Sequence, residues 1–179
     1  LKLNINPHYV IGDIDSIKNS EKDKLIKQNK LIRIKEQETT DFEKAISRIK
    51  APIIFCFGFI GKRLDHTLAV INVISNYHKK NNIILIGKSD VIITVSDSIS
   101  IDLPKKSRVS IWPLSEIKFD KSYGLKWPLN NITMRPNERI GTSNKSLKRN
   151  IKIFLHDDNN GSYLLILCKK NLKYIKNVF

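Results

Sequence analysis

Two aspartates spaced two residues apart are the first residues in this chain whose types and spacing suggest chemistry. Asp13 and Asp15 follow a short apolar segment, residues 9–11, and a glycine. In extended backbone, residues i and i+2 point to the same side, so both carboxylates can face one point. A cation between them would relieve their repulsion, and Mg²⁺ prefers oxygen ligands of this kind. The alternative is an ordinary turn, in which Gly and Asp are common.

A second acidic segment, residues 36–41, comes just before a predicted helix. Thr40 and Glu43 have the spacing of a capping box, which places Asp41 in the first helical turn. The helix dipole favours an anion there, so Asp41 has a structural explanation as well as a metal-binding one.

A third segment combines glycines with charges between a predicted strand and a predicted helix. Gly58 and Gly61 precede Lys62 and Arg63, and the backbone N–H groups of such a loop can bind phosphate. The segment lacks the Walker A spacing. His66, at the helix start, is either catalytic or bonded to nearby backbone.

The first half of the chain must position these segments, and its pattern alternates strands with helices. Apolar strands are predicted at residues 9–11, 31–34, 53–57 and 83–86, with helices at 21–29, 42–49 and 64–77. This alternation predicts a parallel α/β sheet, whose ligands bind beyond the carboxyl ends of the strands. We expect the 53–57 strand to be buried on both faces, and the last helix to bury Leu64, Leu68, Ile71 and Ile74.

The second half, from about residue 89, changes to short strands, with no convincing helix before the C-terminus. Strands are predicted at residues 91–95, 98–103, 108–112, 151–155 and 163–167. Residues 157–161 are expected to form the turn of a hairpin between the last two. We therefore predict an α/β domain over residues 1–88 and an all-β sandwich over residues 89–179.

Two segments of the β half have side chains suited to a ligand. Trp127 lies between turn-forming residues, where its ring is either partly exposed for stacking on a flat heterocycle or part of the core. Thr142, Ser143 and Asn144 offer small hydrogen-bonding groups, and the alternative for them is a polar turn.

Composition restricts the class of protein. The chain has 179 residues, of which 41% are hydrophobic and 27% charged, which excludes disorder. No apolar run approaches the ~20 residues of a membrane span, and residues 1–7 do not resemble a secretory signal. Cys56 and Cys168 form neither a disulfide scaffold nor a metal motif, so we expect a cytoplasmic protein.

The net charge of +15 keeps a basic nucleic-acid-binding protein as an alternative. Against it, the lysines are scattered along the chain, and the acidic segments would repel a phosphate backbone. We therefore expect no primary role in nucleic-acid binding, although a basic field would still attract a polyphosphate substrate.

Taken together, the segments resemble the thiamine pyrophosphokinase (thiamin diphosphokinase) family. The resemblance rests on five segments in the family's order: residues 12–16, 40–42, 61–67, 124–129 and 142–144. It implies a Rossmann-like α/β catalytic domain followed by a thiamine-binding β-sandwich, and a homodimer with the active site at its interface. The implied reaction transfers pyrophosphate from ATP to the thiamine hydroxyl, giving thiamine diphosphate and AMP.

The resemblance also implies roles for individual residues. Asp13, Asp15 and Asp41 would hold Mg²⁺ and act in catalysis together with Asp65. The nucleotide and its phosphates would contact Gly58, Gly61, Lys62, Arg63 and His66. Thiamine would contact Gln37, Trp127, Thr142, Ser143 and Asn144.

The sequence departs from the family pattern in three places. Relatives usually have a further N-terminal strand and an Asp-Gly-Gly segment before position 1, which this sequence lacks. Glu36 and Glu38 stand where Asp is usual, and Lys62 stands where Gly is common. These departures keep open a family member that binds thiamine or nucleotide without turnover.

Overall fold

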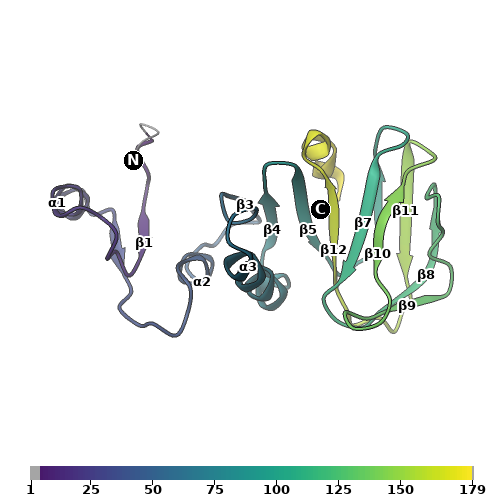
Figure 1. The fold of residues 1–179 in the computed structure, drawn as a ribbon, viewed down its shortest axis with the longest axis horizontal. Coiled ribbons are helices and arrows are strands. Elements are labelled where there is room, and N and C mark those ends of the chain that lie inside the picture. The colour runs from purple at the N-terminus through teal and green to yellow at the C-terminus, as the bar shows by residue number, and fades with distance from the viewer. Residues whose placement is uncertain (1–4, 179) are drawn as a thin grey trace. The chain divides into compact units, whose positions relative to one another are not determined.

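The computed structural model describes residues 5–178, and Figure 1 shows them as a ribbon. Its contacts divide the chain into two compact units, Leu1–Lys50 and Ala51–Phe179, which we call the N-terminal and the C-terminal unit. The expectation about a secretory signal falls partly on residues 1–4, outside the described part. Within the described residues, no helix is long and apolar enough to cross a membrane.

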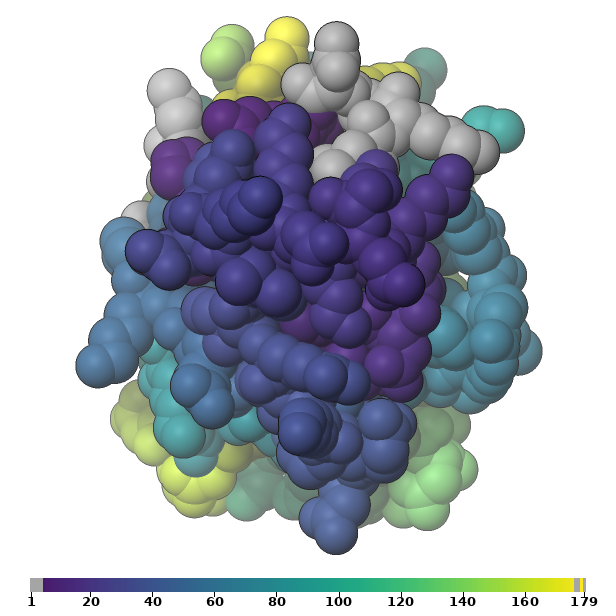
Figure 2. All heavy atoms as spheres, turned by 90° about the vertical axis from the view of Figure 1, so that its left-hand side faces the viewer, coloured from purple at the N-terminus to yellow at the C-terminus, as the bar shows by residue number. Residues whose placement is uncertain are grey.

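The N-terminal unit alternates strands and helices, as the sequence predicts. Its elements are β1 (Val10–Gly12), α1 (Asn19–Lys27), β2 (Leu31–Arg33) and α2 (Asp41–Ile46). β1 and β2 pair in parallel, and both helices bury apolar side chains such as Leu25 and Phe42. Thr40 caps α2 by accepting a hydrogen bond from the Glu43 amide, which confirms that part of the predicted capping box. Figure 2 draws the atoms of this unit in purple and dark blue.

The C-terminal unit contains two sheets, visible in Figure 1. The six-stranded sheet has the order β10-β7-β12-β5-β4-β3 and is antiparallel except for the parallel pair β3–β4. Its strands are β3 (Ile53–Phe57), β4 (Asn82–Ile86), β5 (Asp90–Val95), β7 (Arg108–Pro113), β10 (Gly141–Lys145) and β12 (Tyr163–Cys168). The four-stranded antiparallel sheet has the order β6-β11-β8-β9, with β6 (Ile99–Asp102), β8 (Ile117–Tyr123), β9 (Ile132–Met134) and β11 (Asn150–Leu155).

The main core draws side chains from both sheets. Ile93 of β5, Ile111 of β7, Phe119 of β8 and Ile153 of β11 are all fully buried in one cluster. The C-terminal 3₁₀ helix η1 (Lys169–Asn177) packs on this unit through Ile175. The chain therefore has mixed sheets with few helices, and each predicted strand corresponds to an observed one. β8, β9 and β10 escaped prediction: β9 is only three residues long and β10 is polar throughout, whereas Ile117 and Phe119 of β8 do alternate with polar residues and were a usable signal.

The expected burial of the 53–57 strand is wrong on one face. Ile54 and Cys56 are buried, but Phe55 and Phe57 are 54% and 64% exposed. Alternate residues of a strand point to opposite faces of the sheet, so one face of β3 is covered by other elements of its unit and the other face is left open.

The expected buried face of α3 (Leu64–Tyr77) is also partly wrong. Leu64 and Leu68 are exposed, whereas the helix buries Val70, Val73 and Ile74. The spacing of residues 70, 73 and 74 is also helical, so the sequence contains two apolar stripes on this helix. The structure buries the stripe of residues 70, 73 and 74.

The predicted hairpin at residues 157–161 is wrong as well. β11 and β12 belong to different sheets, so the turn carries the chain from one sheet to the other. A Cβ at Gly161 would lie 1.8 Å from the Glu116 carbonyl oxygen, so this crossing needs glycine at that position. Turn residues show that the chain reverses, but they do not show which strands then pair.

The predicted domain boundary near residue 88 falls between β4 and β5. These strands are adjacent and antiparallel in one sheet, with Ile86 opposite Val91. The division of contacts lies earlier, between Lys50 and Ala51. The domain boundary at residue 88 therefore stays a prediction, and the six-stranded sheet is continuous across it.

Candidate functional site

In the N-terminal unit, Asp13 and Asp41 lie together at the carboxyl end of β1. The Asp13 amide donates to Oδ1 of Asp41 at 3.3 Å. Gly12 makes this approach possible, because a Cβ there would lie 2.8 Å from the same Oδ1. Asp41 is the first residue of α2, so its carboxylate also lies at the positive end of the helix.

Asp15 takes a different direction. Its carboxylate is 3.8 Å from Nη2 of Arg33, and its amide donates to Oδ1 of Asp13 at 3.2 Å. Within the residues that the structure describes, no group of three or more His, Cys, Asp or Glu side chains is arranged to hold a metal ion. The common metal role of Asp13, Asp15 and Asp41 therefore stays a prediction, and the contact between the first and the last of them joins the Asp13 backbone amide to the Asp41 carboxylate.

The pair Asp13 and Asp41 fits a divalent cation by its chemistry. Mg²⁺ is usually bound by one or two carboxylates, with water and substrate phosphates completing its shell. The approach of Asp41 to the glycine backbone keeps its oxygens close to Asp13 without a bulky side chain between them. Asp13 and Asp41 are therefore the candidates for metal ligands, and a magnesium site formed by them stays a prediction.

A buried lysine supports the acidic segment. Nζ of Lys44 lies 3.9 Å from Oδ1 of Asp41 and 3.9 Å from Oε1 of Glu36, and its side chain is only 3% exposed. Buried charges are stable when paired, and the pairs of Lys44 with Glu36 and Asp41 hold the segment before α2 against the helix. Sequence reasoning missed this residue, although its i+3 spacing from Asp41 on a predicted helix was a usable signal.

Glu36 shapes the loop that precedes α2. It accepts hydrogen bonds from the amides of Glu38 and Thr39 and from the Thr39 hydroxyl. The Thr39 hydrogen bonds lower the pKa of Glu36, and the charge of Lys44 adds to this effect. Gln37, at the tip of this loop, is exposed. Glu36 therefore acts as a structural brace here.

In the C-terminal unit, the predicted phosphate loop connects β3 to α3. Gly58 and Gly61 both have positive φ, +83° and +92°, which only glycine adopts readily. The residues that follow, Lys62, Arg63 and His66, are all exposed at the start of the helix. The loop thus offers accessible backbone and basic side chains, which suits an anionic ligand.

Asp65 and Arg63 form an ion pair at the same helix start. The guanidinium donates to both carboxylate oxygens, through Nε at 3.1 Å and Nη2 at 2.5 Å. The Arg63 side chain, and then the His66 amide, lower the pKa of Asp65 to about 2. Asp65 is therefore a carboxylate paired with Arg63, and its catalytic role stays a prediction.

Two of the predicted thiamine residues of the β half, Asn144 and Trp127, are in direct contact. Asn144 accepts a hydrogen bond from the Trp127 amide at 3.1 Å and donates to the Trp127 carbonyl at 2.7 Å. Trp127 itself is 50% exposed, with Nζ of Lys126 4.5 Å from the ring centroid. Thr142 and Ser143 are exposed beside Asn144 in the sequence, and Asn144 is buried. The exposed indole agrees with the ligand interpretation of Trp127 rather than with the core one.

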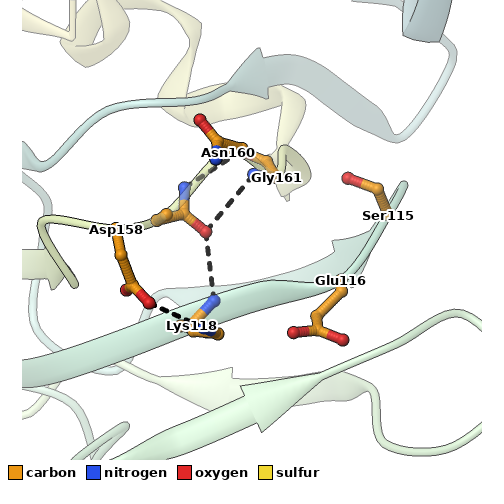
Figure 3. Close-up of a pocket in the computed structure, with 7 residues that line it drawn as sticks. Ser115, Glu116, Lys118, Asp158, Asn160 and Gly161 are labelled. Atoms are coloured by element: carbon orange, nitrogen blue, oxygen red, sulfur yellow. Dashed lines mark hydrogen bonds and ion pairs between the residues drawn. The ribbon is translucent and has the colours of Figure 1, made fainter.

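A polar hollow lies elsewhere in the C-terminal unit and contains none of the predicted site residues (Figure 3). It is lined by Ser115, Glu116, Lys118, Asp158, Asn159, Asn160 and Gly161. Lys118 pairs with Asp158 at 2.7 Å, and Asn159 accepts a hydrogen bond from the Lys118 amide. These polar groups hold one another, so the hollow is explained by the structure of the 157–161 crossing.

Two profiles of known protein families match this chain, one in each half. Residues 1–86 match the profile described as "Thiamin pyrophosphokinase, catalytic domain". Residues 93–158 match the profile described as "Thiamin pyrophosphokinase, vitamin B1 binding domain". A comparison with curated proteins found no match.

Solved structures of similar fold agree with these profiles. The thiamine pyrophosphokinase of Bacillus subtilis has a TM-score of 0.74 at 25% identity, covering 93% of this chain and 81% of that one. That of Geobacillus thermodenitrificans has a TM-score of 0.75 at 21% identity, covering 93% and 80%. That of Candida albicans has a TM-score of 0.77 at 18% identity, covering 94% and 75%. At the two lower identities, the likeness is one of fold.

Proposed function

The chain belongs to the thiamin pyrophosphokinase family, and we propose that it transfers pyrophosphate from ATP to the hydroxyl of thiamine, giving thiamine diphosphate and AMP. The observation that carries the proposal is the match of both family profiles, in order, over most of the chain. The pair Asp13 and Asp41 beside Gly12 supports it with a site suited to a metal–phosphate substrate.

The reaction makes one bond and breaks another. The thiamine hydroxyl oxygen attacks the β-phosphorus of ATP, the bond from that phosphorus to the α–β bridging oxygen breaks, and AMP leaves with this oxygen. The hydroxyl proton passes to a base. Such transfers depend on charge neutralisation and in-line positioning more than on covalent chemistry by the protein.

The residues of this chain divide that work. Asp13 and Asp41, together with Asp15 in the family's pattern, are proposed to hold Mg²⁺, which when bound neutralises phosphate oxygens. Lys62 and Arg63 are proposed to bind the nucleotide phosphates with the loop glycines Gly58 and Gly61 and with His66. Asp65 is proposed to hold the guanidinium of Arg63 in one orientation, as the two hydrogen bonds between them support.

Thiamine is proposed to stack on Trp127, whose exposed indole supports this role. Gln37, Thr142 and Ser143 are proposed to contact thiamine, and Asn144 is proposed to belong to the same site through its hydrogen bonds to Trp127. Flat heterocycles bind exposed aromatic rings well, and small polar side chains fix their orientation.

The finer architecture is also part of the proposal. Residues 1–88 are proposed to act as a Rossmann-like catalytic region and residues 89–179 as a thiamine-binding β-sandwich. The parallel pairs β1–β2 and β3–β4 support the first, and the core shared by two sheets supports the second. A cytoplasmic homodimer with the active site at its interface is proposed by analogy with the family.

An AMP-release assay with thiamine, ATP and Mg²⁺ tests the function directly. We expect wild-type protein to release AMP only when thiamine is present. Asp13→Asn and Asp41→Asn should each lower turnover by about a hundredfold or more, because the phosphates lose their metal ligands. Asp23→Asn, at an exposed aspartate of α1, is the matched control and should keep full activity.

Two results would contradict the proposal. Near-normal turnover by both Asp13→Asn and Asp41→Asn would remove these carboxylates from the site. Absence of AMP release by the wild type, with thiamine binding retained in calorimetry, would instead identify a family member that binds without turnover.

A further inference from the structure

We propose that Asn144 is a positioning residue that holds Trp127 in place for thiamine and does not itself contact the substrate; this inference rests on the function proposed above. The basis is the way in which its buried amide group is engaged by the backbone of Trp127. The proposal separates the role of Asn144 from that of its exposed neighbours Thr142 and Ser143.

The side-chain amide of Asn144 pairs with the Trp127 backbone much as a neighbouring strand would. Oδ1 accepts from the Trp127 amide at 3.1 Å, and Nδ2 donates to the Trp127 carbonyl at 2.7 Å. Oδ1 also accepts from the Lys145 amide at 2.8 Å, so both of its lone pairs are engaged. A flipped amide would oppose donor to donor and acceptor to acceptor, so these contacts fix its orientation.

Burial restricts what else Asn144 can contact. It is only 4% exposed, whereas Trp127 is 50% exposed. With Oδ1 fully used and one N–H of Nδ2 bonded to the Trp127 carbonyl, a single N–H of this buried amide is left for any other partner. Trp127, by contrast, has half of its surface accessible to a ligand in solution.

The local backbone explains why Asn144 points inward. β10 has a register shift between Gly141 and Asn144, and Ser143 within it has a positive φ of 61°. The Ser143 amide donates to the Ser110 hydroxyl at 3.0 Å, which holds the irregular strand against β7. Such a bulge redirects side chains, and here it turns Asn144 toward the 124–129 segment.

Further contacts attach that segment to the end of β10. The Lys126 amide donates to the Lys145 carbonyl at 2.8 Å, and Leu125 forms a bridge with Ser146. Two residues after Trp127 in the sequence, the Leu129 amide donates to the Ser122 hydroxyl at 2.8 Å. Trp127 therefore lies between anchored neighbours, and Asn144 provides the anchor at the residue itself.

The first test measures the position of Trp127 without any substrate. The chain has two tryptophans, so Trp112→Phe leaves Trp127 as the sole indole. In that background, Asn144→Ala should raise acrylamide quenching of Trp127 by about twofold, because the loop loses its anchor. The matched control is Asn159→Ala. The side-chain amide of Asn159 also hydrogen-bonds to backbone groups, those of Lys118 and Gly161, and none of these belongs to the 124–129 segment. This control should leave the quenching unchanged.

The second test is a double-mutant cycle on thiamine kinetics. Asn144→Ala should raise the KM for thiamine about tenfold and leave the KM for ATP within about twofold. In a Trp127→Ala background, the same change should have almost no effect on the KM for thiamine, because its only route to the substrate is gone. An equal tenfold effect in both backgrounds would show direct contact and overturn the proposal.

A third variant keeps the test valid if Asn144→Ala folds poorly. Asn144→Asp preserves the shape and one acceptor, but its ionised form places a second oxygen against the Trp127 carbonyl. Protonation restores a donor at that point, so Trp127 quenching should fall as the pH is lowered and this carboxyl becomes protonated. The wild type should show no such pH dependence, and a variant without it would count against the anchor.

The outcomes separate this inference from the proposed function. If the wild type releases no AMP, the function fails, while the quenching measurements still decide whether Asn144 fixes Trp127. If turnover is normal and Asn144→Ala changes neither quenching nor the KM for thiamine, the function stands and the positioning role is wrong.

Discussion

At the scale of single residues, the catalytic proposal depends on a contact that a glycine allows. Gly12 lets the Asp41 carboxylate approach the end of β1, where the Asp13 amide meets it. The buried ammonium group of Lys44, 3.9 Å from Oδ1 of Asp41, balances the negative charge of that carboxylate. The acidic site is thus made by a small residue and a buried cation as much as by its carboxylates.

Gly12→Ala should damage both stability and turnover. Its new Cβ would lie 2.8 Å from Oδ1 of Asp41, so the carboxylate must move. We expect a loss of about 1–3 kcal/mol in the free energy of unfolding, measured in urea, and a fall of about tenfold or more in AMP release. In an Asp41→Ala background the stability cost should be smaller; an equal cost there would show that the contact is not the cause.

Residue types at the site were predictable from sequence, but their contacts were only partly so. The aspartates and Trp127 stand out by spacing and by neighbouring turn residues. The direction of Asp15 toward Arg33, and of Asn144 toward Trp127, depends on backbone irregularities and on partners distant in sequence. Local patterns do not encode such pairings.

At the scale of elements, β3 shows how sheet position overrides an apolar sequence. Residues 53–57 are all apolar, yet burial alternates along β3, the last strand of its sheet, because only one face of the strand is covered. A pattern that looks buried on both faces can therefore belong to an edge. The 157–161 turn is a second example. Its residues specify a chain reversal, but the strands on either side, β11 and β12, pair within two different sheets.

The two cysteines should differ in reactivity because of these positions. Cys56 is buried in β3, and burial raises the pKa of its thiol to about 11, so little thiolate forms at pH 8. Cys168, at the end of β12, is partly exposed. We expect one rapidly reacting thiol per native chain with Ellman's reagent and two after denaturation.

Single substitutions assign that rapid reaction. Cys168→Ser should abolish it, whereas Cys56→Ser should leave it in place. The opposite result would mean that β3 is far more open than its burial indicates.

At the scale of the whole molecule, the dominant property is a net charge of +15. A field of this sign attracts polyphosphates and weakens as salt shortens its range, to about 10 Å at 0.1 M ionic strength. Thiamine is a cation, so the same field does not favour it.

We therefore expect the KM for ATP to rise about fivefold between 50 and 300 mM NaCl, with a much smaller change for thiamine. Steady-state AMP release measures both, and sucrose of equal osmolarity is the control. Parallel increases for the two substrates would argue against electrostatic attraction. Tight binding of random duplex DNA with a steep salt dependence would instead favour the nucleic-acid alternative.

The hydrogen-bonded junction of β4 and β5 has a consequence for evolution and protein engineering. The segment matched to the catalytic profile and the segment matched to the vitamin-binding profile contribute adjacent strands to a single sheet. A chimera joined at residue 88 would pair β4 of one homologue with β5 of another, so side chains from two parents would have to pack together across this pair. A chimera joined near Lys50 would keep that sheet whole.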